Sequence, residues 1–83
     1  MNNELREKVL QQLRITLKNR REDAGHSMNR LSEMSGLSQQ TISYIERGKR
    51  QPSVDSFLRI CEALEVDASE LLLEAEVKST LDA

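Results

Sequence analysis

The segment that decides the fold runs from residue 31 to residue 53 and reads LSEMSGLSQQTISYIERGKRQPS. Gly36 ends one short stretch of helical periodicity, and Ser38 has a side chain suited to begin another. Gly48 supplies a left-handed residue after the second stretch, and Pro52 prevents a helix from continuing through the basic loop. The segment therefore predicts two short helices that meet across a tight turn.

The flanking sequence has the same periodicity. Apolar residues recur every three or four positions along most of the chain, which predicts an all-α fold. Ser27 and Ser53 are suited to begin two of the helices, and Asp67 with Glu70 forms an acidic capping box at a third. We expect five helices in one domain of residues 1–83, with a core at 10–74 and a frayed tail at 77–83. The expected helices cover residues 3–24, 28–35, 39–47, 54–65 and 67–76.

The expected core consists of residues that share one face within each helix. In the first helix these are Leu10, Leu13, Leu17 and Ala24, with Val9 and Arg20 at the edge of the stripe. The second helix adds Met28, Leu31 and Ser35, with Met34 as a further filler of the core. The fourth helix adds Phe57, Ile60, Cys61 and Leu64.

Composition excludes several classes of function. Cys61 is the only cysteine and His26 the only histidine among the 83 residues, so no internal disulfide and no metal site with four Cys or His ligands can form. We also find no Gly-rich phosphate loop, nucleophile elbow or paired carboxylates in an apolar setting. We therefore expect no enzyme, no catalytic residue, no cofactor, no metal and no small-molecule ligand. Apolar runs are too short to span a membrane, and we expect a cytoplasmic protein.

The third expected helix, from about Gln39 to Arg47, has two unlike faces. Its inner face contains two isoleucines and, unexpectedly, Glu46. Its outer face, with Gln40, Ser43, Tyr44 and Arg47, contains no acid, although the chain has 14. Residues 1–59 carry a net charge of +4 and residues 60–83 a net charge of −6. An acid-free face within a basic half of the chain favours a polyanionic partner.

Double-stranded DNA fits this face. A glutamine amide presents a donor beside an acceptor, which matches the adenine edge in the major groove, and Gln39 and Gln40 lie in the first helical turn. The helix N-termini at Ser27 and Ser38 offer unsatisfied amides to phosphates. A set of basic side chains at the end of the helix adds positive charge: Arg47, Lys49 and Arg50.

The chain resembles the Xre family of phage-repressor and Cro-like regulators from about Leu13 to Leu72. The resemblance is carried by residues 31–53, by the spacing from Arg21 to Gly25, and by ALEVDASELL at 63–72. It implies a lambda-repressor-like five-helix fold in which the two middle helices form a helix-turn-helix and the second of them lies in the major groove. Met28 departs from the family pattern, where a glutamine often grips a phosphate. His26 stands where leucine is usual.

The resemblance also implies roles for individual residues in binding a pseudo-palindromic operator as a homodimer. The positions that read bases are Gln39, Gln40, Ser43 and Tyr44. The positions that contact phosphates are Ser27, Arg47, Lys49 and Arg50, to which the helix N-terminus at Ser38 adds a further phosphate position. Three settings stay open: phage-type repressor, restriction-modification controller and antitoxin-linked autoregulator.

A buried Glu46 requires a cationic partner. The helical wheel slightly prefers Arg20, whereas the family resemblance selects Arg21, and we follow the resemblance.

Three consecutive leucines at 71–73 cannot all face one core, because they span about 200° of a helix. The resemblance directs Leu71 inward and leaves Leu72 and Leu73 on an apolar ridge with Val66, Ala68 and Ala75. We expect this ridge to form the dimer interface. The alternative is that the N-terminal extension covers the leucines within one monomer through Leu5, Val9 and Ile15.

A different class of function is a protein-interaction module that keeps the fold without binding an operator. Its binding surface would be the acidic C-terminal half with the Leu-rich fifth helix. The acid-free outer face of the third helix argues against this alternative.

Overall fold

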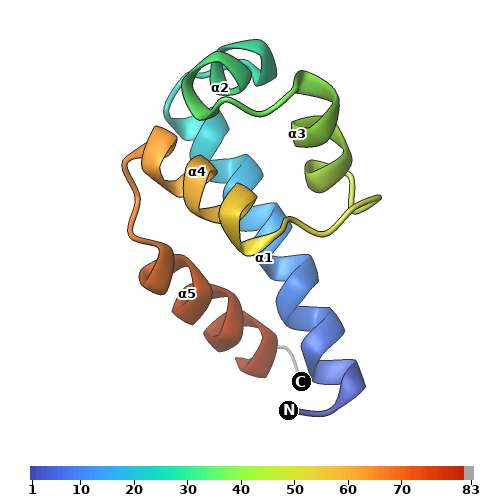
Figure 1. Cartoon of the computed structure of the whole chain (residues 1–83). Coiled ribbons are helices and arrows are strands. Elements are labelled where there is room, and N and C mark those ends of the chain that lie inside the picture. The colour runs from blue at the N-terminus through green and yellow to red at the C-terminus, as the bar shows by residue number, and fades with distance from the viewer. Residues whose placement is uncertain (82–83) are drawn as a thin grey trace.

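The computed structural model describes residues 1–81, which contain five helices and no strand. Figure 1 shows α2, α3 and α4 gathered around the C-terminal half of α1, while α5 lies beside its N-terminal half. The predicted all-α class is therefore confirmed. The helix bounds are α1 Asn3–Asp23, α2 Met28–Ser35, α3 Gln39–Glu46, α4 Val54–Leu64 and α5 Ala68–Leu81.

Serine caps determine where three of the helices begin. The hydroxyls of Ser27, Ser38 and Ser53 each accept a hydrogen bond at 3.0 Å from the backbone amide three residues later. Each bond satisfies one of the amides that the first helical turn leaves without an intrahelical partner. Gly36 ends α2 with a φ of 75°, a conformation that glycine adopts without steric cost. These predicted boundaries are confirmed.

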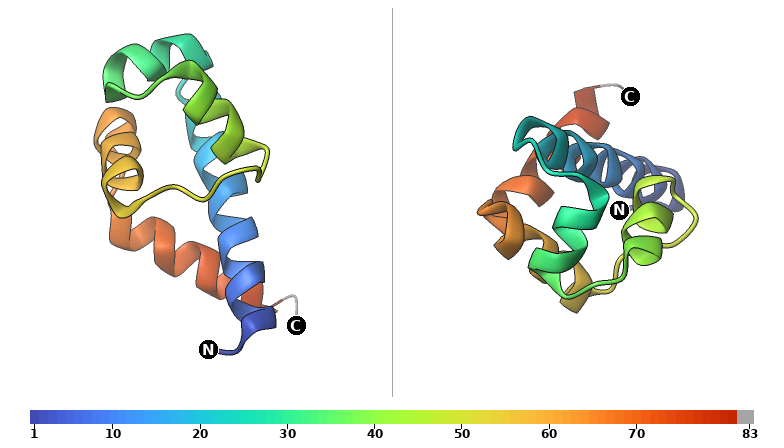
Figure 2. Two further views of the ribbon diagram at one scale, coloured as in Figure 1. Left: turned by 45° about the vertical axis from the view of Figure 1, so that its right-hand side comes forward. Right: turned by 90° about the horizontal axis from the view of Figure 1, so that it is seen from above.

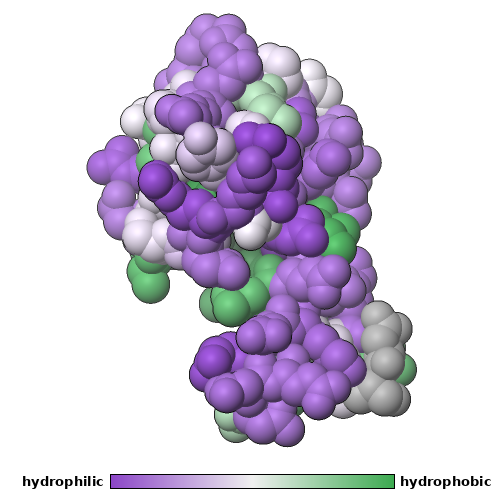
Figure 3. All heavy atoms as spheres, turned by 90° about the vertical axis from the view of Figure 1, so that its right-hand side faces the viewer, coloured by the Kyte–Doolittle hydropathy of each residue, from purple (hydrophilic) through white to green (hydrophobic). Residues whose placement is uncertain are grey.

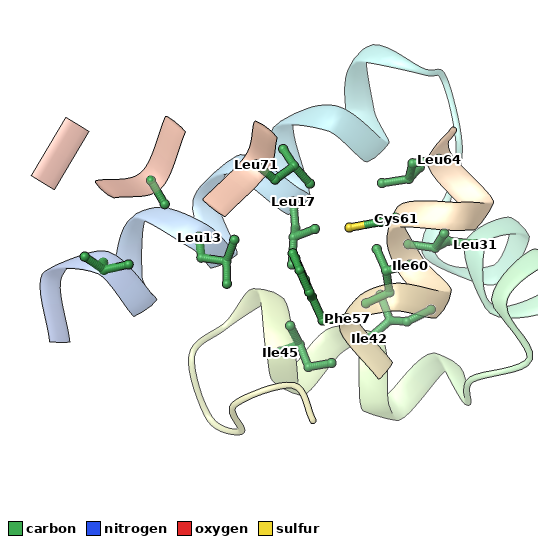
Figure 4. Packing of buried hydrophobic residues seen from close by; sticks show 12 residues of the cluster. Leu13, Leu17, Leu31, Ile42, Ile45, Phe57, Ile60, Cys61, Leu64 and Leu71 are labelled. Carbon is green, nitrogen blue, oxygen red and sulfur yellow. The ribbon is translucent and has the colours of Figure 1, made fainter. Parts of the chain in front are cut away.

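The core lies where α1, α3 and α4 converge. Figure 4 shows the ring of Phe57 from α4 among aliphatic side chains that include Leu17 of α1 and Ile45 of α3. Cys61 is buried as expected, and its burial, with a smaller contribution from Asp67, raises the pKa of the thiol to about 11. The buried apolar set is Val9, Leu13, Leu17, Leu31, Ile42, Ile45, Phe57, Ile60, Cys61, Leu64, Leu71 and Ala75.

The structure corrects three expectations about this core. Ala24 is exposed because α1 ends one residue before it. Met34 of α2 is 38% exposed and therefore lies at the surface and not within the core. Leu10 is only half-buried, whereas Thr16 of the same helix is fully buried. The buried face of α1 is therefore rotated around the helix axis relative to the apolar stripe expected from the sequence. The reason is that α1 contacts different helices at its two ends.

The last helix is longer than expected. The prediction of a frayed tail from residue 77 is wrong for residues 77–81, which continue α5; residues 82 and 83 lie outside the described part. Leu71, Ala75 and Ser79 are buried, and α5 packs chiefly against α1. The Ser79 hydroxyl donates to the Ala75 carbonyl at 2.7 Å. Small side chains at two of these positions allow a close approach between the helices.

Figure 2 shows, from a second direction, that α1 and α5 meet near the end where the N-terminus lies. In residues 1–81 no helix is both long enough and apolar enough to cross a lipid bilayer.

Candidate nucleic-acid interface

A short, well-bonded turn places α3 relative to α2. The Ser32 hydroxyl donates to the Leu37 carbonyl at 2.6 Å, and the Leu37 amide donates to the Ser35 hydroxyl at 3.2 Å. Ser35 is itself buried. Because side chains of α2 satisfy backbone groups of the turn, α3 is held in a fixed direction.

The two faces of α3 differ as the sequence predicts. Ile42, Ile45 and Glu46 are buried, while Gln39 and Gln40 are exposed. Ser43 and Tyr44 are half-buried, and the outward face contains no acid. Figure 3 views the molecule from the side on which α3 lies in Figure 1, and hydrophilic residues cover most of that surface. A polar, acid-free helix face is therefore available to a polyanion.

An ion pair joins α3 to α1 beneath this face. Arg21 Nε donates to Glu46 Oε2 at 2.7 Å, and Arg21 Nη2 donates to Glu46 Oε1 at 2.8 Å. The remaining Arg21 Nη1 donates to the His26 carbonyl at 2.8 Å. The hydrogen bond to Glu46 raises the pKa of the Arg21 guanidinium above its ordinary value. The structure thus brings together the pair that the resemblance selected, while Arg20 pairs with Glu74 at 3.0 Å.

Arg14 contributes to the site without having been predicted. Its Nη1 donates to the Glu46 carbonyl at 3.2 Å, near the C-terminus of α3. Gly48 has a φ of 74°, and any Cβ atom introduced there by substitution would lie 2.9 Å from Arg14 Nε. The role of Arg14 depends on how α1 crosses α3, and no local sequence pattern specifies that crossing.

The second turn of α3 carries a cluster around Tyr44. Gln40 Nε2 donates to the Tyr44 hydroxyl at 2.9 Å. The guanidinium carbons of Arg47 and Arg50 lie 5.4 and 5.8 Å from the centre of the Tyr44 ring, within the range of cation–π attraction. Three sequence-predicted site residues, Gln40, Arg47 and Arg50, therefore approach a fourth, Tyr44.

The remaining predicted site residues lie around this cluster. Lys49 is exposed in the following loop, and Gln39 is exposed in the first turn of α3. No acid among residues 1–81 forms an ion pair with Arg47, Lys49 or Arg50. These three cations are therefore available to an external anion.

The hydroxyls of Ser27 and Ser38 are already used within their own helices, so fewer groups at these helix N-termini can bind a phosphate than expected. Each hydroxyl accepts from a backbone amide of its own helix, and Ser38 Oγ also donates to Thr41 Oγ1 at 2.7 Å. The cap bond uses the third amide of the helix, so the first two amides are left for an outside acceptor.

The expected dimer residues are exposed on α5. Leu72 is 40% exposed and borders an apolar hollow with Leu10 and Val54. Leu73 is 61% exposed and borders a separate hollow with Val77. The N-terminal extension therefore does not bury these leucines, although α1 packs on α5.

The composition of the expected ridge needs correction. Ala75 is fully buried against α1, because it follows Leu71 by four residues and shares its face. Val77 and Leu81 are exposed and extend the apolar surface beside Leu73.

Comparisons with known proteins agree with this geometry. A family model described as "Helix-turn-helix" matches residues 17–71. Two curated relatives from two strains of Mycobacterium tuberculosis, both named uncharacterized HTH-type transcriptional regulators, are 41% identical over 61 residues. Each match covers 74% of this chain and 44% of the relative. The chain thus spans less than half the length of these relatives.

Solved structures give the same assignment. The restriction-modification controller protein C.AhdI from Aeromonas hydrophila is 31% identical, with a TM-score of 0.71, and the match covers 75% of this chain and 94% of that one. The clp gene regulator ClgR from Corynebacterium glutamicum is 28% identical, with a TM-score of 0.80, covering 89% and 79%. The wild-type controller C.Esp1396I is 28% identical, with a TM-score of 0.77, covering 90% and 96%.

The matched region contains the turn between α2 and α3, the Arg21–Glu46 pair and the whole acid-free face of α3. The family consists of regulators and not of enzymes, in agreement with the composition. Because the family model matches more than half of the chain, this chain belongs to the helix-turn-helix family of the Xre type.

Proposed function

We propose that this chain is a transcription regulator that binds a pseudo-palindromic DNA site as a two-fold homodimer, with α3 in the major groove. The observation that carries the proposal is the outward face of α3. This face has exposed amide, hydroxyl and guanidinium groups, and the one carboxylate of α3, Glu46, is turned inward onto Arg21. The phosphates of DNA are negatively charged and repel carboxylates, so an acid-free face favours entry of this helix into a groove.

Base reading is assigned to the side chains that point away from the core along α3. Gln39 and Gln40 are exposed in the first turn of α3, where a recognition helix reaches base edges. Each amide can pair with adenine through one N–H and one carbonyl oxygen. Ser43 and Tyr44 follow one turn later on the same side of the helix.

Phosphate contacts are assigned to groups that flank α3. The first amides of α2 and α3, at the caps Ser27 and Ser38, supply donors at the positive ends of two helix dipoles. Arg47, Lys49 and Arg50 add positive charges that no acid in residues 1–81 neutralises. Such contacts hold the protein on the duplex, while bases determine the sequence.

Dimerisation is assigned to the exposed leucines of α5. A two-fold axis at Leu72 and Leu73 would place two copies of α3 about one DNA turn apart, roughly 34–36 Å. The regulators C.AhdI, C.Esp1396I and ClgR share the fold over most of this chain, which supports a regulatory role for it.

The experiment is a salt titration of binding to a fluorescently labelled random-sequence duplex. The logarithm of the association constant should fall linearly with the logarithm of salt concentration. Replacing both Arg47 and Arg50 with alanine should reduce the slope by about 2, or about 1 per phosphate contact. Lys78→Ala is the matched control: it removes a positive charge from α5, where Lys78 pairs with Glu74, and should leave the slope unchanged.

The opposite result would favour the protein-interaction module. In that case the wild-type protein would not bind the duplex even at low salt, and the arginine variant would behave like the Lys78→Ala control.

A further inference from the structure

The cluster around Tyr44 supports a more specific role than the one assigned above. We infer that Tyr44 is a positioning residue: its hydroxyl sets the amide of Gln40 for base reading, and its ring orients the two arginines that contact phosphates. The inference rests on the proposed function, because it concerns how the same face of α3 reads DNA.

The first step concerns the amide of Gln40. Gln40 Nε2 donates to the Tyr44 hydroxyl at 2.9 Å along the outer face of α3. An amide nitrogen carries two N–H groups, so this bond leaves one donor together with the carbonyl acceptor. One donor beside one acceptor is the combination that the adenine edge requires in the major groove. The bond to Tyr44 therefore orients Gln40 without using its reading groups.

The second step concerns the entropy of an exposed side chain. A free glutamine side chain samples many rotamers, and fixing it on a base costs conformational entropy. Because the residues lie four positions apart, the bond forms within one helix turn and needs no rearrangement of the fold. Gln40 is thus ordered before it meets DNA, and pre-ordering reduces the cost of binding.

The third step concerns the arginines. Arg47 and Arg50 both approach the ring of Tyr44, at 5.4 and 5.8 Å. Both guanidinium groups therefore lie near one ring, and no acid in residues 1–81 forms an ion pair with either of them. The ring gives the two cations a common support, and each guanidinium keeps donors with which it can bind a phosphate.

The backbone of Tyr44 anchors the same loop independently of the side chain. Its carbonyl accepts from the amides of Lys49 at 2.8 Å and Arg50 at 3.3 Å. A substitution of the side chain therefore leaves the path of the loop intact. This separation makes the hydroxyl and the ring testable one at a time.

The experiment uses a duplex that the wild-type protein enriches from a randomised pool. Tyr44→Phe keeps the ring and removes the hydroxyl, so it should lower affinity for this duplex about tenfold, within the range of one bidentate base contact. Its loss of affinity for a random duplex should be much smaller, because affinity for random DNA comes mainly from phosphate contacts. The double variant Gln40→Ala with Tyr44→Phe should bind within about twofold of Gln40→Ala alone, because the hydroxyl acts through Gln40.

Tyr44→Leu is the second variant, which keeps an apolar side chain while removing the aromatic ring. It should also weaken binding to the random duplex and reduce the salt slope, because Arg47 and Arg50 lose their common support. Thermal unfolding of each variant, followed by circular dichroism, verifies that the proteins are folded.

Additive losses for Gln40→Ala and Tyr44→Phe would overturn the inference, because they would mean that the hydroxyl contacts DNA on its own. A Tyr44→Phe variant as tight and selective as the wild type would also overturn it. If the wild type enriched no sequence and bound no duplex, the proposed function would fail first and the inference with it.

Discussion

Arg21 and Glu46 form a bidentate ion pair, at 2.7 and 2.8 Å, in the contact between α1 and α3. Their side chains are only 9% and 5% exposed. Since Arg21 also binds the His26 carbonyl, one guanidinium connects the inner side of α3 with the turn that precedes α2. The orientation of the helix proposed to read DNA thus depends on a residue of α1.

Glu46→Gln should destabilise the fold by about 3–5 kcal/mol, because the charge of Arg21 is left buried without a counter-charge. Urea unfolding followed by circular dichroism at pH 7 measures the change. The matched control is Arg20→Ala, which removes a pair with Glu74 that is about one third exposed and should cost less than about 1 kcal/mol. If Glu46→Gln and Arg20→Ala lower the free energy of unfolding equally, the buried Arg21–Glu46 pair is no more important for stability than the exposed Arg20–Glu74 pair.

Gly48→Ala should cost more stability than Gly25→Ala. Both residues have φ near 75°, but a Cβ at Gly25 meets nothing within 4 Å, whereas one at Gly48 lies 2.9 Å from Arg14 Nε. Left-handed strain alone costs about 1 kcal/mol, and at position 48 the displacement of Arg14 from the Glu46 carbonyl adds to it. Thermal unfolding of both variants is the measurement.

Adding Arg14→Ala to Gly48→Ala should recover part of that extra cost by removing the clash. If Gly25→Ala and Gly48→Ala are equally unstable, Arg14 does not restrict the loop after α3.

Thr16→Val should raise the free energy of unfolding by about 1 kcal/mol. Thr16 is buried, and its hydroxyl has no hydrogen-bond partner among residues 1–81. Valine has the same shape, is β-branched and has a similar helix propensity, so the substitution chiefly removes an unsatisfied polar group. A loss of stability in denaturant unfolding would show that the hydroxyl has a partner in solution.

Leu72→Glu with Leu73→Glu should give a folded monomer with greatly weakened binding to the selected duplex. Both leucine side chains are exposed in the single chain, so the substitutions should not disturb its fold. In a two-fold dimer, however, the introduced carboxylates of the two copies would face one another in a contact that excludes water. Sedimentation measures the mass without DNA, and circular dichroism verifies the fold. The single variants show which leucine matters, because the two border different hollows. A double variant that stays dimeric would reject this interface.

The helix boundaries could be predicted because their causes are local. Ser27, Ser38 and Ser53 each bond to an amide of their own first turn, and Gly36 adopts the backbone conformation that ends α2. The burial of Glu46 could also be predicted, because its place between isoleucine faces follows from helical spacing alone.

The features that could not be predicted depend on how helices cross. Ser79 is buried because its small side chain lets α5 approach α1, but a hydropathy pattern counts serine as polar and favours an exposed tail. Arg14 reaches the end of α3 only because of the crossing of α1 and α3. The choice of Arg21 over Arg20 came from the family resemblance, since both arginines lie near the edge of the same stripe.

Selection of bound sites from a pool of random duplexes by the wild-type protein tests directly whether α3 reads DNA. If α3 reads DNA in a two-fold dimer, the pool should yield one enriched sequence with two-fold symmetry, with half-site centres about 10–10.5 base pairs apart. Gln39→Ala and Gln40→Ala should each relax the preference at a defined base pair in both half-sites, at a cost of about 1–3 kcal/mol. A pool that stays random after repeated selection, or an enriched sequence unchanged by both glutamine variants, would contradict the claim that α3 reads DNA.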